Sequence, residues 1–474
     1  MLDYKKPDFN FSAPIELAKR KEHNEIQNQN YRTVFMRDRD RVMYSSAFRR
    51  LAGKTQIYLT GKDDHQRNRL THTLEVSQIA RTVSQALNLD CDLTEAIALA
   101  HDLGHTPFGH AGEQTLHEIM VPNSSVSIKN SPMNDPNLMS APEIDQPLFG
   151  FKHNVQSLRV AASLENNYGN AGLNLTNFTL WGILHHSSLE YKEGKVNTAY
   201  LKTKYREQYK DDIAFDGIAN SEAWSFEAFV VAQADEIAQW HHDLEDALRG
   251  CAMTNADVCA AINDNLSHIM TKEGKSRLEE LSYRDRIDKK YVTDLSRIVV
   301  NTLVNRLIEC SLYNLKILWG DVVDKRTFFI KHNGSQDNIK NAIAFIKFGE
   351  TDEKMEHFHS EYPSIISKKI HHSRDVERMN AKGKYIIKKL FQAYYSHPQQ
   401  LPDNIIVRYM VDIGCYSDLK TANNEGTGTV RIKFEDHFPN ASLSDKIALM
   451  RKICDHIAGM TDHFAIEEYE NLYG

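Results

Sequence analysis

The stretch between residues 101 and 113 holds an unusual density of side chains that can do chemistry. It contains three histidines and two carboxylates: His101, Asp102, His105, His110 and Glu113. Metal ligands and general acids or bases are drawn from these residue types, because they supply lone pairs or protons near neutral pH. A hydrophobic core does not need such a run, so the stretch predicts an active site.

The first pair in this stretch is expected at the end of a helix. Asp92 and Glu95 have capping-box spacing ahead of an apolar run, and Gly104 stands where a C-terminal cap belongs. On a 3.6-residue period His101 falls on the apolar side of this helix, so its ring should point inward. A buried imidazole needs a partner, which other helices must supply.

A second helix is predicted to present His72 at the end of an apolar stripe. The stripe steps by four and three residues through Val76, Ile79, Val83 and Ala86. A lone histidine in such a place is more often a satisfied core residue than a ligand. Its pairing with a His-Asp dipeptide reverses that preference.

A third helix brings a carboxylate. Asp235 lies at helical spacing among Ala228, Val231 and Ala238, where an unpaired carboxylate would be costly. Glu236 is the competing choice, but its side of the helix is more polar. We therefore favour Asp235.

These residues predict a site for one divalent metal ion. The two imidazoles and two carboxylates form a mixed nitrogen and oxygen set that leaves positions open for water and phosphate oxygens. No thiolate takes part, which argues against a closed structural zinc site. Magnesium suits phosphates and imidazoles favour manganese or another transition ion, so Mg²⁺ and Mn²⁺ both stay open. The expected ligands are His72, His101, Asp102 and Asp235.

The order His, His-Asp, Asp on successive helices resembles the HD superfamily of metal-dependent phosphohydrolases. Further segments resemble, in order, the bacterial deoxyguanosine triphosphate triphosphohydrolases. Together they cover nearly the whole chain, at residues 37–41, 48–56, 69–72, 101–113, 151–159, 234–238, 242–248 and 455–465.

The resemblance implies roles beyond the metal ligands. His110 and Glu113 match the family's catalytic pair, and a spacing of three would let the carboxylate orient the imidazole. His105, which we group with the catalytic residues, and His153 match positions expected to contact the phosphates. Family members cut deoxynucleoside triphosphates at the α-phosphorus and release the deoxynucleoside and inorganic triphosphate.

Other positions concern substrate binding. Gln56 and Asp243 match family positions near the deoxyribose edge, and Arg69 could meet charge on the phosphates. Gln239 departs from the family, in which a tyrosine usually packs on the sugar one turn after the last metal ligand. The family also implies a homo-oligomer, commonly a hexamer, with activating nucleotides at subunit contacts.

Composition bounds the class of protein. The chain has 474 residues, 41% of them hydrophobic, and a net charge of −7, which argues against a surface coated for nucleic acid. We find no apolar run long enough to cross a membrane and no secretion signal, so a cytoplasmic location is expected. The six cysteines show no paired spacing and are expected to be reduced thiols.

The fold is expected to be mainly α, with an HD-domain helical core and a smaller, mostly helical C-terminal region containing a few short strands. We divide the chain into an N-terminal helical segment (1–60), the metallophosphohydrolase core (61–320) and an accessory region (321–474). Helical spacing covers residues 154–166, 176–186, 222–248, 291–315 and 375–395, and β-type alternation covers 326–331 and 429–434.

Two segments have no settled role. Residues 121–148 are rich in Pro, Ser, Asn and Met, which predicts a mobile loop that is either a surface insertion or a lid over substrate. Residues 191–210 are rich in lysine and tyrosine and are either a solvated helix face or insertion, or a triphosphate-binding edge.

Two rival functions remain beside dNTP triphosphohydrolysis. Another HD enzyme, a nucleotidase or phosphodiesterase, would keep the metal ligands, but the motifs of the tetraphosphate and cyclic dinucleotide hydrolases are not met. A nucleotide sensor or single-stranded nucleic-acid binder with a vestigial site is the alternative from another class. The intact set of ligand and acid/base residues weighs against it.

Overall fold

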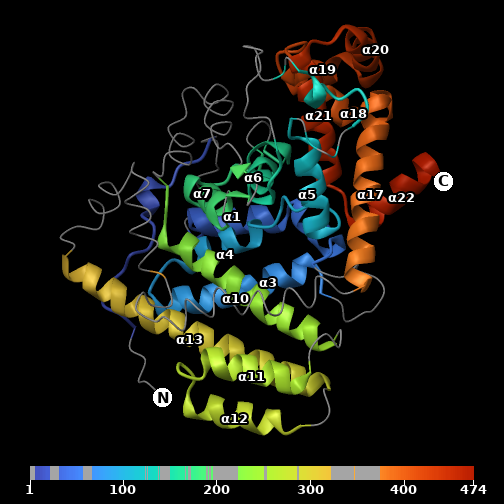
Figure 1. Ribbon diagram of the computed structural model, residues 1–474. Coiled ribbons are helices and arrows are strands. Elements are labelled where there is room, and N and C mark those ends of the chain that lie inside the picture. The colour runs from blue at the N-terminus through green and yellow to red at the C-terminus, as the bar shows by residue number, and fades with distance from the viewer. Residues whose placement is uncertain are drawn as a thin grey trace.

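The computed structural model describes most of the chain, and nearly all of that part is helical (Figure 1). The described residues are 6–21, 31–56, 67–122, 124, 126, 128–136, 138, 150–165, 167–168, 172–187, 190–191, 194–195, 223–249, 254–284, 288–321, 346 and 374–474. The mainly α class expected from the sequence is confirmed. No helix within these ranges is long and apolar enough to span a membrane.

The N-terminal part carries the helices that surround the site. Its α-helices are α1 (Val34–Met43), α2 (Ser46–Arg50), α3 (Arg69–Ala86), α4 (Cys91–Ala100), α5 (Gly109–Ile119), α6 (His153–Arg159), α7 (Asn177–His185), α10 (Phe226–Arg249), α11 (Asn255–Leu266), α12 (Lys272–Ser282) and α13 (Lys289–Asp321). Shorter elements are the 3₁₀ turns η1 (Ile15–Leu17), η2 (Leu51–Gly53) and η3 (Pro132–Asn134), the π-helical η5 (Val160–Leu164) and the paired strands β1 (Glu190–Tyr191) and β2 (Gly194–Lys195).

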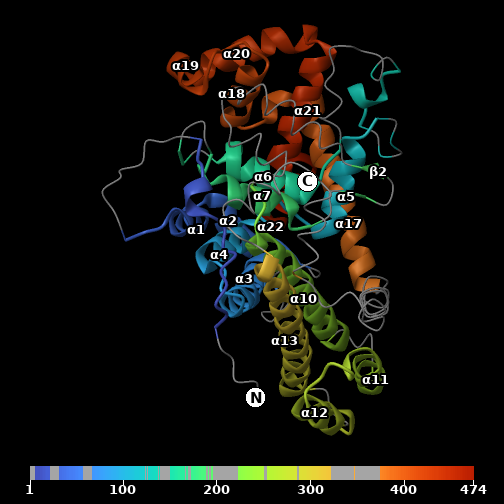
Figure 2. The same ribbon diagram turned by 90° about the vertical axis from the view of Figure 1, so that its left-hand side faces the viewer.

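The C-terminal part begins at the long helix α17. Its elements are α17 (Arg374–Ser396), η7 (Pro398–Gln400), α18 (Asp403–Asp412), α19 (Leu419–Glu425), α20 (Thr427–His437), η8 (Phe438–Asn440), α21 (Leu443–Ala458) and α22 (Asp462–Tyr473). The views in Figures 1 and 2 place α18–α20 at the end of the molecule opposite to α11 and α12.

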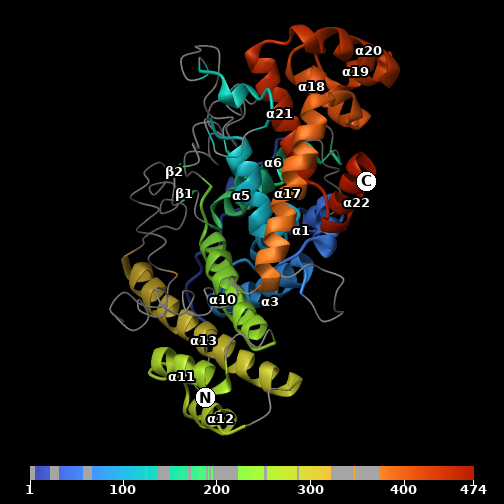
Figure 3. The same cartoon turned by 45° about the vertical axis from the view of Figure 1, so that its right-hand side comes forward.

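Two hydrophobic clusters hold the described helices together. The first joins α3, α4, α7, α10 and α13 through residues such as Val76, Ile97 and Ile237. The second joins α17–α22 with α5, whose Leu116 packs in it. Figure 3 shows α5 running beside α17. The chain therefore crosses from one cluster to the other between α4 and α5, where the stretch rich in histidine lies.

Polar contacts lock the two clusters together at this crossing. Asp455 on α21 accepts from Arg159 and Gln156 on α6, and all three side chains are buried. Lys54 donates to the carbonyls of His105 and Ala458. Lys54 thus links the C-terminal helix α21 to His105, while the boundaries proposed at residues 60 and 320 stay a prediction.

The helices expected over 154–166, 176–186, 222–248, 291–315 and 375–395 are all present, with ends that shift by a few residues. The β-type run at 429–434 is wrong, because these residues lie in α20. Val430 and Phe434 are buried while Ile432 between them is 63% exposed, so the chain follows the helical rather than the alternating pattern. The run at 326–331 lies outside the described residues.

The start of α4 also differs from expectation. Its N-cap is Asp90, whose carboxylate accepts from the amides of Asp92 and Leu93. Asp92 pairs with Arg39 instead, and Glu95 pairs with Arg81 and Arg39. The predicted capping box was wrong, because tertiary ion pairs recruit those two carboxylates. The end of the helix is as expected, since α4 stops at Ala100.

The two segments without a settled role are described only in part. In the 121–148 segment, Ile128 and Met133 are buried in the second cluster and η3 packs against α21. The mobility expected for this loop stays a prediction. In the lysine-rich segment, the described backbone is the hairpin of β1 and β2, and residues 196–210 lie outside the described part.

Glu227 at the start of α10 makes the stability depend on pH. It is buried, and its Oε1 accepts from the amides of Ala13 and Asp90 at 3.1 and 3.0 Å. Burial raises the pKa of Glu227 from 4.5 to about 7. A carboxyl whose folded pKa is raised favours the fold when protonated, so this contribution is lost as pH rises from the unfolded pKa to the folded one.

Glu227→Gln should remove this dependence. Relative to the variant, the wild type should lose about 3 kcal/mol of unfolding free energy across that window, at about 1.4 kcal/mol per pKa unit. Urea denaturation of both proteins from about pH 5 to about pH 8 measures the difference. A constant difference over this range would mean that Glu227 titrates normally in the folded protein.

Candidate metal centre

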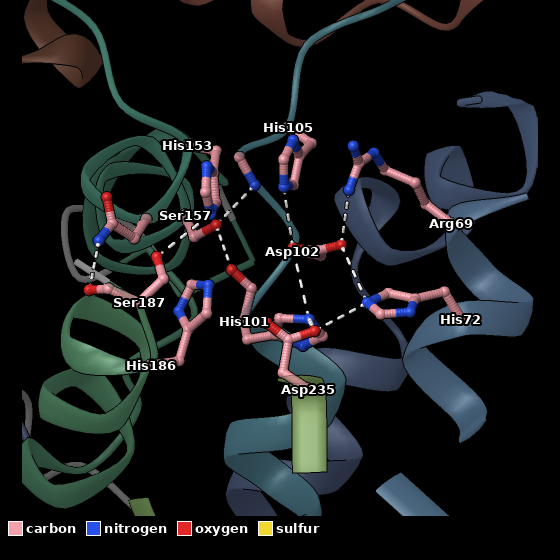
Figure 4. Close-up of polar contacts among 12 residues, drawn as sticks. Arg69, His72, His101, Asp102, His105, His153, Ser157, His186, Ser187 and Asp235 are labelled. Carbon is pink, nitrogen blue, oxygen red and sulfur yellow. Dashed lines mark hydrogen bonds and ion pairs between the residues drawn. The ribbon is translucent and has the colours of Figure 1, made fainter. Parts of the chain in front are cut away.

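Three expected ligands lie close together among the helices of the first hydrophobic cluster. His72 comes from the first turn of α3, His101 from the end of α4 and Asp235 from the middle of α10. Their donor atoms all lie within 4.8 Å of one another. Asp235 Oδ1 is 3.0 Å from His72 Nε2 and 3.7 Å from His101 Nε2. Figure 4 shows the three side chains pointing toward one another.

Asp102 stands beside this group. Its Oδ1 is 3.4 Å from His101 Nε2, and its Oδ2 is 3.9 Å from His72 Nε2. The same oxygens accept from His105 Nε2 at 3.0 Å and from Arg69 Nη1 at 2.8 Å. The carboxylate therefore joins the predicted ligands to the residues that precede α5.

Hydrogen bonds to surrounding groups orient the rings of both predicted histidine ligands. His101 Nδ1 lies 2.6 Å from the Ala98 carbonyl, which can only accept, so Nδ1 carries the proton. His72 Nδ1 lies 3.3 Å from His242 Nδ1, and His242 Nε2 contacts the Glu75 carboxylate. A proton on His242 Nε2 leaves its Nδ1 free to accept from His72 Nδ1. Both rings then direct an Nε2 lone pair toward Asp235, and metal-binding histidines are commonly oriented in this way by a hydrogen bond on their other nitrogen.

The group formed by His72, His101 and Asp235 fits a divalent cation. The Nε2 of His101 is buried and has no hydrogen-bond partner among the described residues, yet it faces two carboxylates. Burial alone would lower the pKa of His101, but the charges of Asp102 and Asp235 outweigh it and raise that pKa to about 9. The negative charge of these two carboxylates would also attract a metal ion. Such an ion would compete with the proton for the lone pair on His101 Nε2.

The remaining histidines form a second group around Glu113. Its Oε2 accepts from His153 Nδ1 at 2.9 Å and lies 3.9 Å from both His105 Nδ1 and His110 Nδ1. The rings of His105 and His153 stack at 3.9 Å between centroids. His110 has a 69% exposed side chain, whereas the others are buried. Burial opposes ionisation of Glu113, but His153 outweighs it and holds the pKa of this carboxyl well below its usual range.

The turn that presents His110 is held by the C-terminal helix. Phe108 and Gly109 both have a positive φ, of 62° and 56°. Phe108 is not a glycine, so this left-handed conformation needs support. Asp462 at the start of α22 supplies it by accepting from the Phe108 amide at 2.9 Å and from the amide of Thr55 at 2.9 Å. Residues more than 350 positions apart thus shape the same turn.

The three expected substrate contacts outside the histidine groups are found in different settings. Arg69 is buried and pairs with Asp102. Gln56 is half-buried, and its buried Oε1 has no hydrogen-bond partner among the residues that the structure describes. Asp243 lies on α10 two turns after Asp235, and burial raises its pKa to about 7. Their contacts with a substrate stay predictions.

Three residues next to the predicted ligands were not expected from the sequence. Glu75 and His242 support His72, and His186 at the end of α7 packs against the His101 ring at 5.0 Å between centroids. Adjacent histidines occur at 185–186 and 241–242, and such pairs were the signal available in the sequence.

Comparison with known proteins agrees with this arrangement. A model of the HD domain matches residues 69–133, and a model of the phosphohydrolase-associated domain matches residues 350–412 and 428–471. A deoxyguanosinetriphosphate triphosphohydrolase-like protein of Bartonella henselae is 33% identical over 100% of this chain and 98% of the relative. The chain belongs to this family. Proteins of the same description from Rickettsia bellii and Thiobacillus denitrificans are each 32% identical over 93% of this chain, and over 92% and 91% of their own lengths.

Membership of the deoxyguanosinetriphosphate triphosphohydrolase-like family identifies the chain as a hydrolase of the metal-binding HD phosphohydrolase superfamily. The HD match covers α3 to η3, which carry His72, His101 and Asp102. The associated-domain match includes α17, α21 and most of α22, the helices that support the turn before α5.

Proposed function

We propose that this protein hydrolyses deoxynucleoside triphosphates, including dGTP, at the α-phosphorus to give the deoxynucleoside and inorganic triphosphate. The observation that carries the proposal is the convergence of His72, His101 and Asp235 beside a separate group of histidines around Glu113. Such a site offers a cation for a phosphate and acid/base groups for the departing oxygen. The names of the relatives point to the same substrate class.

The metal ion, Mg²⁺ or Mn²⁺, would be bound by His72, His101, Asp102 and Asp235 and would polarise the α-phosphate and lower the pKa of a bound water. Arg69 keeps Asp102 in place through its 2.8 Å contact and adds positive charge at the edge of the cluster. The packed rings of His105 and His153 exclude water from the side that faces Glu113.

We assign the role of general acid to His110. Its ring is exposed at the start of α5, so a proton on it is accessible to a substrate oxygen. Glu113 Oε2 lies 3.9 Å from His110 Nδ1, so a carboxylate stands behind the ring. Donation to the 5′ oxygen would let the deoxynucleoside leave as an alcohol. Gln56 and Asp243 are proposed to bind the deoxyribose.

His110→Ala should retain the metal and lose most of its turnover. Removal of a positioned general acid costs roughly 10²–10⁴-fold in rate. The comparison is kcat with dGTP alongside metal content, with His463→Ala as a control, because His463 is also an exposed histidine but lies on α22. Full activity in His110→Ala would remove it from the mechanism.

The substrate assignment itself is tested on the purified protein. It is incubated with each of the four deoxynucleoside triphosphates, singly and mixed, with Mg²⁺ or Mn²⁺, and the products are separated by anion exchange. Free deoxynucleoside with intact triphosphate is the expected result. Nucleoside monophosphate with pyrophosphate, or no turnover in any mixture, would contradict the proposal.

A further inference from the structure

A group of side chains that can bind a metal lies on the other side of the His72 ring from Asp235. Glu75 lies one turn after His72 on α3. His241 and His242 lie on α10, which packs against α3. One donor atom from each of Glu75, His241 and His242 lies within 4.8 Å of the others. We call these three residues the outer group.

His241 directs a lone pair at the Glu75 carboxylate. Its Nδ1 is 3.4 Å from the Ile237 carbonyl, which can only accept, so Nδ1 carries the proton of the neutral ring. Burial lowers the pKa of His241 to about 4, so this ring is neutral at neutral pH. Its Nε2 then faces Glu75 Oε2 at 3.6 Å. Two acceptors this close repel each other unless a positive group lies between them.

His242 completes a set of ligands that suits zinc. Its Nε2 contacts the same oxygen, Glu75 Oε2. Zinc binds imidazoles and carboxylates tetrahedrally at about 2.0–2.2 Å, which places neighbouring ligand atoms about 3.4 Å apart. The 3.6 Å between His241 Nε2 and Glu75 Oε2 is close to this spacing. Two histidines and one glutamate are also a known zinc set, with water as the fourth ligand.

The surroundings of the outer group permit a cation to bind. The Glu75 side chain is 40% exposed, so a hydrated ion can reach it from solvent. Arg67 is the competing positive charge, with its Nε 3.4 Å from Glu75 Oε2. Its Nη2 lies closer to Glu245 Oε2, at 3.0 Å, and Ser296 donates to the other oxygen of that carboxylate. Arg67 can therefore stay paired with Glu245 while Glu75 binds an ion.

An ion on His242 Nε2 would change which nitrogen of His72 carries a proton. The ion takes the place of the proton on Nε2, so the proton of the neutral His242 ring lies on Nδ1. This Nδ1 then donates across the 3.3 Å contact to His72 Nδ1. The proton of His72 lies on Nε2, where Asp235 Oδ1 at 3.0 Å can accept it. Each ring keeps one proton, but His72 no longer offers a lone pair to the predicted metal centre.

We propose that Glu75, His241 and His242 bind Zn²⁺, and that this binding opposes occupation of the predicted metal centre by Mg²⁺ or Mn²⁺. The outer group is thus an inhibitory metal site. Mixed nitrogen and oxygen ligands bind Zn²⁺ more tightly than Mn²⁺, and Mg²⁺ prefers oxygen ligands, so a low concentration of Zn²⁺ is sufficient to fill it. The proposal rests on the metal centre of the proposed function and adds a control of that centre.

The first test measures Zn²⁺ binding by the outer group. Asp235→Ala removes a carboxylate from the predicted metal centre, and the metal-free, full-length variant is titrated with Zn²⁺ by calorimetry without nucleotide. Addition of His241→Gln should lower the number of bound ions by one per chain. Addition of His456→Gln is the matched control, because this ring packs against Tyr394 in the C-terminal part, and it should leave the number unchanged. Equal numbers in all three proteins would overturn the proposal.

His241→Cys distinguishes a ligand from a residue that only packs. A thiolate also binds zinc, so this variant should keep the ion that His241→Gln loses. With Co²⁺ in place of Zn²⁺, a thiolate ligand adds an intense ultraviolet charge-transfer band that the wild type should lack. A folded His241→Cys protein that shows neither the ion nor the band would contradict a ligand role for His241.

The second test measures the opposition between the two sites. The wild-type protein is loaded with Mn²⁺ and titrated with Zn²⁺, and electron paramagnetic resonance reports the released Mn²⁺. His241→Gln should bind Mn²⁺ as the wild type does. Loss of a ligand costs at least as much affinity as loss of a residue that orients one, so half-release should require about 10-fold more Zn²⁺ or above.

Direct replacement of Mn²⁺ by Zn²⁺ at the predicted metal centre would give the same release curve in both proteins. That result would overturn the inhibitory role. Because no nucleotide is present, both tests are independent of the substrate. A protein that shows the expected zinc effects but does not hydrolyse dNTPs would contradict the proposed function and leave the outer group as a metal site.

Discussion

Asp102→Ala should abolish metal binding and hydrolysis together. The carboxylate contacts His101, His72, His105 and Arg69, so it lies at the centre of the site. Its loss would remove a predicted metal ligand and leave the buried Arg69 without this counter-charge. A metal ion contributes several kcal/mol to transition-state stabilisation, so activity should fall by about 10³-fold or more.

Metal content by mass spectrometry and kcat with dGTP are measured on the same preparations of Asp102→Ala. Asp102→Asn keeps the shape of the side chain and should fail in the same way, because the charge is the essential property. Asp436→Ala changes an exposed aspartate on α20 and should have no effect. If Asp102→Ala kept its metal at wild-type affinity, Asp102 would not be a ligand.

Asp455→Ala should be among the most destabilising single substitutions. Burial opposes ionisation of Asp455, but the Arg159 guanidinium outweighs it and holds the pKa of this carboxyl below its ordinary value. Removing the carboxylate leaves Arg159, which is only 6% exposed, with an uncompensated charge. Such losses cost about 3–5 kcal/mol of unfolding free energy.

A double variant separates the cost of an unpaired charge from the value of the pair. Arg159→Met combined with Asp455→Leu removes both charges and keeps apolar volume, which is often neutral or stabilising in a buried site. We expect it to recover most of the stability lost in Asp455→Ala. Urea denaturation measures all three proteins. A single variant within about 1 kcal/mol of wild type would show that the pair is solvated in solution.

The position of this ion pair explains why the C-terminal region matters to the site. Through its contacts with Gln156 and Arg159, Asp455 connects α21 to α6, the helix that begins with His153. One turn beyond α21, Asp462 fixes the turn before His110. The C-terminal helices therefore support the predicted catalytic stretch, in addition to forming a hydrophobic cluster of their own.

The helices around the site could be predicted because their buried faces require apolar residues at a regular helical spacing. The apolar stripe that begins at His72 and the alanine-rich surroundings of Asp235 both follow the 3.6-residue period. The same period put His101 on an inward face. The order of the His, His-Asp and Asp motifs then indicated the family, and the comparison with known proteins confirmed it.

Local patterns failed where tertiary contacts decided the outcome. The alternation of Val430, Ile432 and Phe434 is compatible with a strand, and only packing in the second cluster selects the helix. Asp92 and Glu95 could cap a helix, but Asp92 pairs with Arg39, and Glu95 pairs with Arg81 and Arg39. Propensity in short segments is a weak preference that such contacts override.

By itself, the sequence determined the mainly helical class, the family and which residues could bind a metal, because these depend on composition, period and motif order. Only the tertiary structure decided which side chains meet. It placed His186 beside Asp102 and Asp462 beside Phe108. These contacts join distant segments whose relative orientation is set by helix packing, and no local pattern encodes that orientation.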